Sequence, residues 1–268
     1  MIFPAFLLLW QAGFIFSGAQ PWRWSEGRGE FIPALSAVLD NQTGQDYVSV
    51  RFQVRVRCGE GGIREYGVVL RDVLMGKQRV EATAYDAIGT VAHCNGEPEI
   101  VPLEATPYPE KERPAFLLFG FSRRDAAGAL STELEGILDY RRRSDSDQSV
   151  EFRSWRRHGA RFTLDGVPDT AFYLIRVPPG RAGLAGFVVE PGTEPRSQLS
   201  RFLRFYDAPA GMAAYIGVFR LEEQTPGRRF LGHEPMPELL APLSAQTPRP
   251  VIAVRGSAPA PGSALVTQ

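Results

Sequence analysis

The chain has 268 residues, which is enough for one large domain or two small ones. Hydrophobic residues make up 44% of it and charged residues 22%, so the composition excludes a wholly disordered chain, a collagen and a multi-span membrane protein. Its 30 basic residues balance 30 acidic ones, and a formal net charge of zero gives no chain-wide electrostatic attraction to nucleic acid.

The N-terminus is almost unbroken apolar sequence from residue 2 to residue 16, followed by the small residues Ser17, Gly18 and Ala19. Such small residues are typical of a signal-peptidase site, so residues 1–19 are predicted to be a signal peptide that is cut after Ala19. A retained membrane anchor is the alternative, although a bilayer core takes about 20 apolar residues. No Lys or Arg precedes the apolar run, so a misassigned or more upstream start is also considered. We therefore expect an exported protein, periplasmic or extracellular, with no stable membrane span after cleavage.

Two cysteines, Cys58 and Cys94, fit an oxidising compartment. The strand alternation places Cys58 on the inward face, where a partner from a facing strand can meet it, so a Cys58–Cys94 disulfide is predicted. In the chain-entropy model such a bridge stabilises by roughly 4 kcal/mol. Two buried free thiols are the alternative. Only His93 lies near the cysteines and no CxxC pair is present, so we expect no metal and no cofactor.

Strand periodicity dominates the first half of the chain. From Val48 to Val56, apolar residues alternate with Ser, Arg and Gln, which is typical of a sheet with one face in water, and Val48 and Phe52 are expected to face inward. Further strands are predicted at 34–39, 66–70, 80–84 and 100–103. Short strands separated by turn signals are typical of an antiparallel sandwich, which we place at residues 20–104.

Residues 105–114 contain three prolines and four charges without periodicity, and we predict a linker there. A second sandwich is predicted at residues 115–235, and a C-terminal extension at 236–268 with helical turns at 237–243 and a disordered tail from about residue 257. The strand-like runs of the second sandwich are 116–121, 134–140, 150–155, 160–164, 171–177, 183–189, 199–206 and 213–221. The predicted fold class is therefore all-β, with two consecutive antiparallel β-sandwich domains.

The order of elements from Leu39 to Asp86 is a strand, an Asn-containing turn, a long alternating strand, Leu70 to Asp72, Gly76 and another alternating strand. This order resembles the immunoglobulin-like or fibronectin-like sandwiches of exported bacterial proteins, in particular the small domains with an FxLYD motif. No tryptophan lies between the two cysteines, so the chain departs from the antibody pattern of a Trp packed on a disulfide.

In the second half, the segment FYLIRVPPGRAGLAGF at 172–187, with Ala210-Gly211 and the later Tyr215-Ile216-Gly217, resembles transthyretin-like or carboxypeptidase-regulatory-like modules of bacterial envelope proteins. Ala182 stands where those modules carry an aromatic residue. The resemblance implies a structural or binding role, because such modules generally have no catalytic residues of their own.

No GxSxG, HExxH, P-loop, GxGxxG or EF-hand pattern is present, and no catalytic residue is expected. The histidines at 93, 158 and 233 stand in loop-like sequence without a placed nucleophile. The carboxylate pairs Glu133/Glu135 and Glu222/Glu223 are candidate glycosidase acids, and a pair two residues apart on a strand shares a face at about 7 Å, a spacing that suits two-carboxylate chemistry. A secreted carbohydrate-active hydrolase is therefore the alternative function, against the simpler interpretation of solvated strand faces.

Arginine is unusually frequent, since only Lys77 and Lys111 among the basic residues are lysines. A GC-rich genome is one explanation, and a recognition surface is the other, because the guanidinium fork binds carboxylate, phosphate or sulfate groups. Phe152 is expected to face the core, which disfavours a stacking platform for nucleic acid. The candidate contact residues form a stripe on one strand and a second cluster around strand ends: Arg51, Arg55 and Arg57, then Arg141, Arg142, Arg143, Arg153, Arg156 and Arg157.

The sequence thus predicts a non-catalytic exported protein that acts as a structural or binding module at the cell envelope. Its expected partner is a protein, an acidic polysaccharide or another envelope component, and not a nucleic acid. A third hypothesis is a subunit of a larger surface assembly that pairs through an edge strand.

Overall fold

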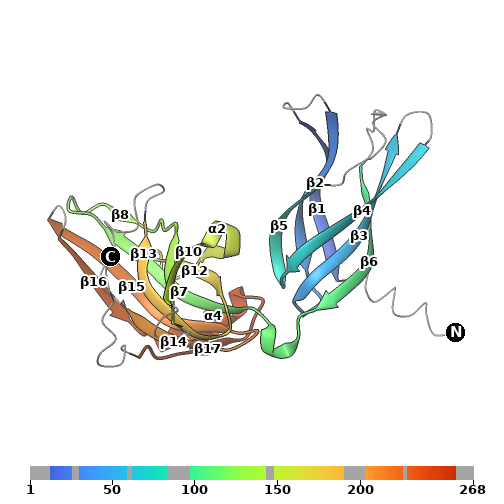
Figure 1. Ribbon diagram of the computed structural model, residues 1–268. Coiled ribbons are helices and arrows are strands. Elements are labelled where there is room, and N and C mark those ends of the chain that lie inside the picture. The colour runs from blue at the N-terminus through green and yellow to red at the C-terminus, as the bar shows by residue number, and fades with distance from the viewer. Residues whose placement is uncertain are drawn as a thin grey trace. The chain divides into compact units, whose positions relative to one another are not determined.

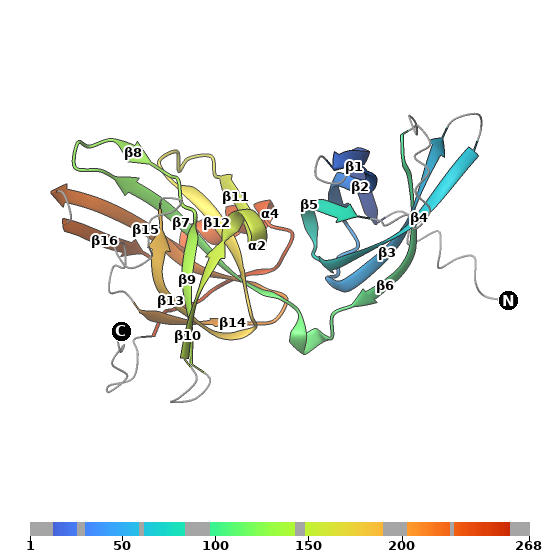
Figure 2. The same ribbon diagram turned by 45° about the horizontal axis from the view of Figure 1, so that its top comes forward.

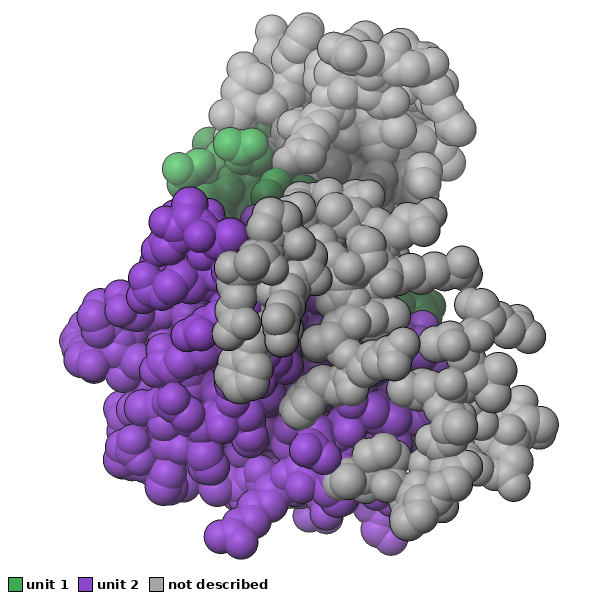
Figure 3. All heavy atoms as spheres, turned by 90° about the vertical axis from the view of Figure 1, so that its left-hand side faces the viewer, with its two compact units in different colours: residues 1–109 green, residues 110–268 purple. Residues whose placement is uncertain are grey.

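The computed structural model describes residues 13–25, 30–58, 62–83, 97–142, 148–189, 203–225 and 228–257. The described chain is mostly β and forms several sheets, which confirms the all-β prediction (Figure 1). It divides into two compact units, residues 1–109 and residues 110–268, which Figure 3 colours separately. In the described ranges, no helix is long and apolar enough to cross a membrane.

The described residues of unit 1 form two three-stranded antiparallel sheets, with the orders β1-β2-β5 and β4-β3-β6. In Figure 2 the strand β3 runs between its neighbours β4 and β6. The strand bounds are β1 (Phe14–Ser25), β2 (Glu30–Asn41), β3 (Tyr47–Cys58), β4 (Gly62–Val73), β5 (Gly76–Thr83) and β6 (Glu99–Pro107).

The core of unit 1 takes side chains from both sheets. Val50 and Phe52 of β3 are fully buried in one cluster with Leu39 of β2, as the alternation predicted. Val48 differs from the prediction and is exposed. The β3–β6 pairing is irregular between Tyr47 and Ser49, and this bulge turns Tyr47 into the core in place of Val48.

The range predicted as a signal peptide overlaps β1. Phe14 is only 6% exposed, and its ring lies 5.5 Å from the ring of Tyr47 and 5.8 Å from that of Phe52. The ring of Phe16 lies 5.0 Å from that of Phe52. Residues 14–19 are therefore part of a core strand, whereas residues 1–12 lie outside the described ranges.

The two units divide between Pro109 and Glu110, inside the range predicted as a linker. The first residues of that range are not irregular, because β6 continues to Pro107. A short 3-10 helix, η1 (Glu110–Glu112), follows before the first strand of unit 2.

In the part of unit 2 that the structure describes, there is a four-stranded sheet with the order β10-β9-β13-β14 and a seven-stranded sheet with the order β11-β12-β7-β15-β16, in which β17 pairs with β15 and β8 with β7. The strands are β7 (Ala115–Arg124), β8 (Leu130–Ser131), β9 (Gly136–Arg142), β10 (Gln148–Ser154), β11 (Gly159–Thr163), β12 (Ala171–Val177), β13 (Gly180–Val188), β14 (Arg204–Ala208), β15 (Ala213–Thr225), β16 (Arg228–Glu234) and β17 (Val251–Ala253).

The larger sheet is mixed, in contrast to the fully antiparallel arrangement that was predicted. Strand β15 pairs in parallel with both β7 and β17. These strands are distant in sequence, so no tight turn joins them. Periodicity along one strand reveals which face is buried but not which strand lies beside it, and this is why the sequence did not predict the parallel pairs.

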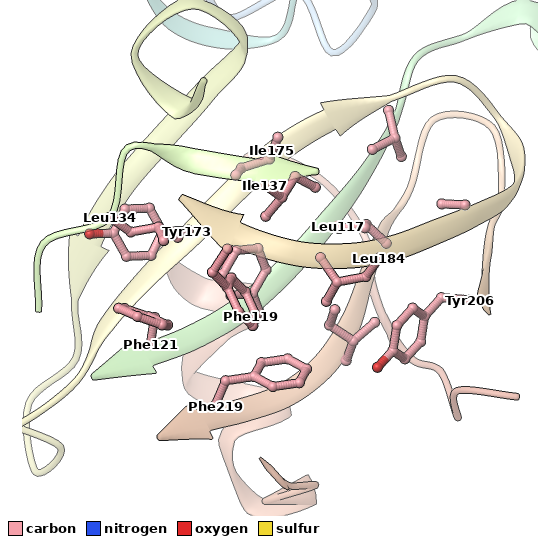
Figure 4. Packing of buried hydrophobic residues seen from close by; sticks show 14 of the residues in the cluster. Leu117, Phe119, Phe121, Leu134, Ile137, Tyr173, Ile175, Leu184, Tyr206 and Phe219 are labelled. Atoms are coloured by element: carbon pink, nitrogen blue, oxygen red, sulfur yellow. The ribbon is translucent and has the colours of Figure 1, made fainter. Parts of the chain in front are cut away.

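The main core of unit 2 combines aromatic with aliphatic side chains and takes residues from both of its sheets (Figure 4). The ring of Phe119 on β7 lies 5.5 Å from that of Phe187 on β13 and 6.1 Å from that of Phe219 on β15. On β7, Phe116 and Leu118 alternate with the core residues Leu117 and Phe119 and are also buried. Strand β7 is therefore buried on both faces, which explains its continuous apolar run.

The described part of the predicted C-terminal extension belongs to unit 2. The 3-10 helix η2 (Pro237–Leu239) and the helix α4 (Leu240–Gln246) occupy the range predicted to be helical, and Leu243 is fully buried. The guanidinium of Arg249 lies 4.0 Å from the ring centre of Phe116. This segment covers the second face of β7, so residues 236–257 complete the fold.

Candidate functional site

The first arginine cluster lies on the solvent-facing side of β3, where the alternation placed it. The guanidinium of Arg51 is 3.2 Å from Glu104 of β6. The guanidinium of Arg55 is 2.8 Å from Glu65 of β4 and 3.8 Å from Glu99 of β6. Each carboxylate comes from a neighbouring strand, so the predicted basic stripe is largely neutralised within its own sheet.

Exposed apolar side chains lie among these charges. Val69 pairs directly with Arg51, and Ile63 pairs directly with Arg57, so all four residues share one side of the sheet. Val69 is 55% exposed and Ile63 is 61% exposed. We call this surface the outer β3 face, and it consists of Arg51, Arg55, Arg57, Ile63, Glu65, Val69, Glu99 and Glu104.

The second cluster is arranged differently, because two of its arginines face the interior of unit 2. The carboxylate of Asp139 is fully buried, and its Oδ2 accepts from Nε of Arg141 at 3.0 Å and from Nε of Arg153 at 2.8 Å. The arginine side chains are only 16% and 15% exposed. Arg141 and Arg153 were predicted to belong to a solvent-facing contact surface, but both side chains are largely buried against Asp139.

Further bonds hold this buried network in place. Arg141 donates to the backbone carbonyls of Arg181 at 2.7 Å and Pro178 at 3.2 Å, and Arg153 lies 2.5 Å from Glu151. The Oδ1 atom of Asp139 is buried and has no hydrogen-bond partner in the described part of the chain. A buried charge needs compensation by partners, and here two guanidinium groups supply it.

The network also explains why Phe152 is 48% exposed, although it was expected to face the core. Along β10, Glu151 pairs directly with Asp139 and Arg153 pairs with Ile137 of β9, so these charged residues share the inward side. Phe152 and Val150 must then point outward, since neighbouring residues of a strand face opposite sides.

Arg156 and Arg157 of the second cluster lie on a short helix. Arg156 belongs to the short helix α2 (Trp155–His158), and its guanidinium lies 4.8 Å from the ring centre of Trp155 and 3.5 Å from Glu135. The Arg142 side chain and Arg143 lie outside the described residues, as do the Cys58 and His158 side chains and all of His93 and Cys94. The predicted disulfide therefore stays a prediction.

The paired carboxylates do not share a strand face. Glu133 and Glu135 lie between the end of β8 and the start of β9, and they contact different arginines, Arg161 at 2.9 Å and Arg156 at 3.5 Å. Glu223 lies 3.5 Å from Arg123 on the neighbouring strand β7. Each of these three carboxylates thus has an arginine of its own as a partner.

The segment that carries Glu133 and Glu135 is held against the core by two aromatic residues, Tyr173 and Trp155. Tyr173 donates its hydroxyl to the carbonyl of Thr132 at 2.5 Å, and the Trp155 indole donates to that of Leu134 at 2.5 Å. Burial raises the pKa of Tyr173, although Arg161 beside it acts in the opposite direction.

Asp139 was not predicted as the centre of the buried network. The available signal was a carboxylate inside the apolar run GILDY, with arginines directly after it. His233 was predicted to stand in loop-like sequence, but it lies on β16 and stacks on Phe219 with ring centres 4.6 Å apart, and its Nε2 lies 2.6 Å from the carbonyl oxygen of Ile216.

The chain was compared with protein-family models, with curated proteins and with solved structures, and none of them matches it.

Proposed function

We propose that this chain is a non-catalytic interaction module of the bacterial cell envelope, and that it contacts a protein partner through the outer β3 face. The observation that carries the proposal is the exposure of Val69 and Ile63 between arginines and glutamates. Arginine together with exposed apolar side chains inside a polar surround is typical of protein interfaces. Export rests on the apolar N-terminal sequence.

The proposal includes a β-sandwich architecture for both units. In each unit one core cluster takes side chains from two sheets, which is how the layers of a sandwich bury their inner faces. For unit 1 we propose the immunoglobulin-like or fibronectin-like class that its sequence resembles, and for residues 115–235 the transthyretin-like class. Such modules act mainly by presenting surfaces.

A protein partner is favoured over an acidic polysaccharide because Arg51 and Arg55, two of the three arginines of this face, are already compensated by glutamates. A polyanion would have to displace Glu104 from Arg51 and both Glu65 and Glu99 from Arg55. These pairs are exposed and individually weak, so a protein surface that offers carboxylates and guanidinium groups together can exchange with them at little cost.

The test is site-specific photo-crosslinking of the full chain in its native envelope, with the photoreactive residue at Val69 or at Val38. Val38 is the matched control, since it is an exposed valine that pairs with an arginine, Arg79, on the other sheet of unit 1. We expect a discrete protein adduct from Val69 and not from Val38. Arg51→Glu is expected to reduce the adduct at least several-fold, whereas Arg79→Glu leaves it unchanged.

Two results contradict the proposal. Equal adducts from Val69 and Val38, or none from Val69, remove the outer β3 face as the contact surface. Salt-sensitive retention on heparin that falls with Arg51→Glu but not with Arg79→Glu replaces the protein partner with an acidic polysaccharide.

A further inference from the structure

The strand β1 begins inside the apolar N-terminal run. Phe14 and Phe16 precede the predicted cleavage point after Ala19, yet both rings pack against Phe52, which is fully buried at the centre of the unit 1 core. Phe16 also pairs directly with Leu39 of β2, another fully buried residue. These two aromatic side chains therefore cover the middle of the core.

The backbone at the start of β1 also makes close contacts, with the turn between β2 and β3. The carbonyl of Gly13 accepts a hydrogen bond from the backbone N–H of Gln42 at 2.7 Å. A Cβ atom at position 13 would lie 2.4 Å from Cγ2 of Thr43, so only glycine allows this close approach without a shift. The contact of Gly13 with the β2–β3 turn fixes the position from which Phe14 enters the core.

From these contacts we infer that residues 14–19 remain in the mature protein as a structural half of β1, and that any processing of the apolar N-terminus occurs before Phe14. Cleavage after Ala19 would remove the residues that pair with Val38, Leu39, Asp40 and Asn41 of β2. It would also expose one side of Phe52. The contribution of these residues to the core is independent of the proposed contact face.

The experiment uses two substitutions in the full chain and the intact mass of the protein isolated from its native host. Phe14→Ala removes a buried ring, and Ile15→Ala is the matched control because the next side chain on the same strand is 48% exposed. If residues 14–19 are retained, Phe14→Ala lowers the unfolding midpoint of unit 1 by more than about 10 °C, whereas Ile15→Ala shifts it by no more than about 2 °C.

If Phe14→Ala does not fold, Phe14→Leu provides a milder version with a shift of a few degrees in the same direction. The intact mass is expected to include Phe14. A mature terminus at Gln20 overturns the inference, and both substitutions would then be removed with the leader and leave stability unchanged. Equal shifts for Phe14→Ala and Ile15→Ala overturn it as well. Failure of the Val69 crosslink affects neither readout, so the two proposals fail separately.

Discussion

At the scale of single residues, Asp139 is a fully buried carboxylate that depends on two arginine partners. Its carboxylate is fully buried between Arg141 and Arg153, so its negative charge compensates two guanidinium groups that are themselves mostly buried. Burying such charges is expensive, and removal of one partner leaves the others uncompensated. The stability of β9 and β10 therefore depends on this one side chain more than on the exposed ion pairs.

Replacement of Asp139 by Asn is expected to lower the free energy of unfolding of unit 2 by about 3 kcal/mol. Glu151→Gln removes a carboxylate that contacts the same Arg153 but is 56% exposed, and it is expected to cost less than about 1 kcal/mol. Urea denaturation followed by intrinsic fluorescence measures both. A cost for Asp139→Asn no larger than that for Glu151→Gln would contradict this account of the network.

Tyr206 is a second buried residue, and burial changes the pKa of its hydroxyl group. Burial raises the pKa of Tyr206 to about 12, and in the described part of the chain its buried hydroxyl has no hydrogen-bond partner. Between pH 10 and pH 12 the unfolded chain loses this proton while the folded protein keeps it, so stability must fall as the pH rises. Burial raises the pKa of Tyr215 as well, which acts in the same direction.

Tyr206→Phe is therefore expected to leave stability at pH 7 unchanged or slightly higher, because it removes an unsatisfied buried hydroxyl. It should also reduce the alkaline loss of unit 2 stability between pH 10 and pH 12 by on the order of 2 kcal/mol. Urea midpoints measured from pH 7 to pH 12 test both points. An unchanged pH profile in the variant would show that Tyr206 does not contribute to the alkaline transition.

At the scale of elements, β9 and β10 show how close backbone contact fixes a strand pair. Gly136 begins β9 opposite Ser154, and a Cβ atom there would lie 2.1 Å from the carbonyl oxygen of Arg153. This approach brings the end of β10 against β9 and places Arg153 where it reaches Asp139. The glycine and the buried ion network thus stabilise the same register.

Gly136→Ala is expected to destabilise unit 2 by about 2 kcal/mol or more, because the added methyl group meets backbone and not a movable side-chain end. Gly67→Ala is the control, since Gly67 also lies within a strand but a Cβ there meets nothing within 4 Å. That change is expected to be neutral or slightly stabilising. Thermal unfolding separates the two, and equal effects would exclude the proposed backbone clash.

At the scale of the whole molecule, the zero net charge is matched by local pairing of charges. Arg51 and Arg55 of β3 contact glutamates of β4 and β6, and Arg141 and Arg153 of unit 2 contact Asp139. A high arginine content therefore does not produce a cationic surface at these sites. Val69 and Ile63 of the outer β3 face are 55% and 61% exposed, more than Val38 and Ile15 of the other sheet at 40% and 48%, and this is why we assign the contact surface to the outer β3 face.

The sequence by itself determined the all-β class, most of the strands and the helical turns near residue 240. These features follow from alternation, turn residues and short-range propensity, which are local properties of the chain. The exposed side of β3 was predictable for the same reason: Arg51 and Arg55 alternate with Val50, Phe52 and Val54.

Only the tertiary structure decided which strands pair in parallel, which arginines have carboxylate partners and which side of β10 faces inward. It also showed that β1 begins within the apolar N-terminus and that β17 joins the large sheet. Each of these features depends on a contact between residues far apart in the chain. Local hydrophobicity predicts Phe152 as a core residue. The buried carboxylate of Asp139 needs a partner, however, and Arg153 supplies it from the inward side of β10, so the neighbouring Phe152 faces outward.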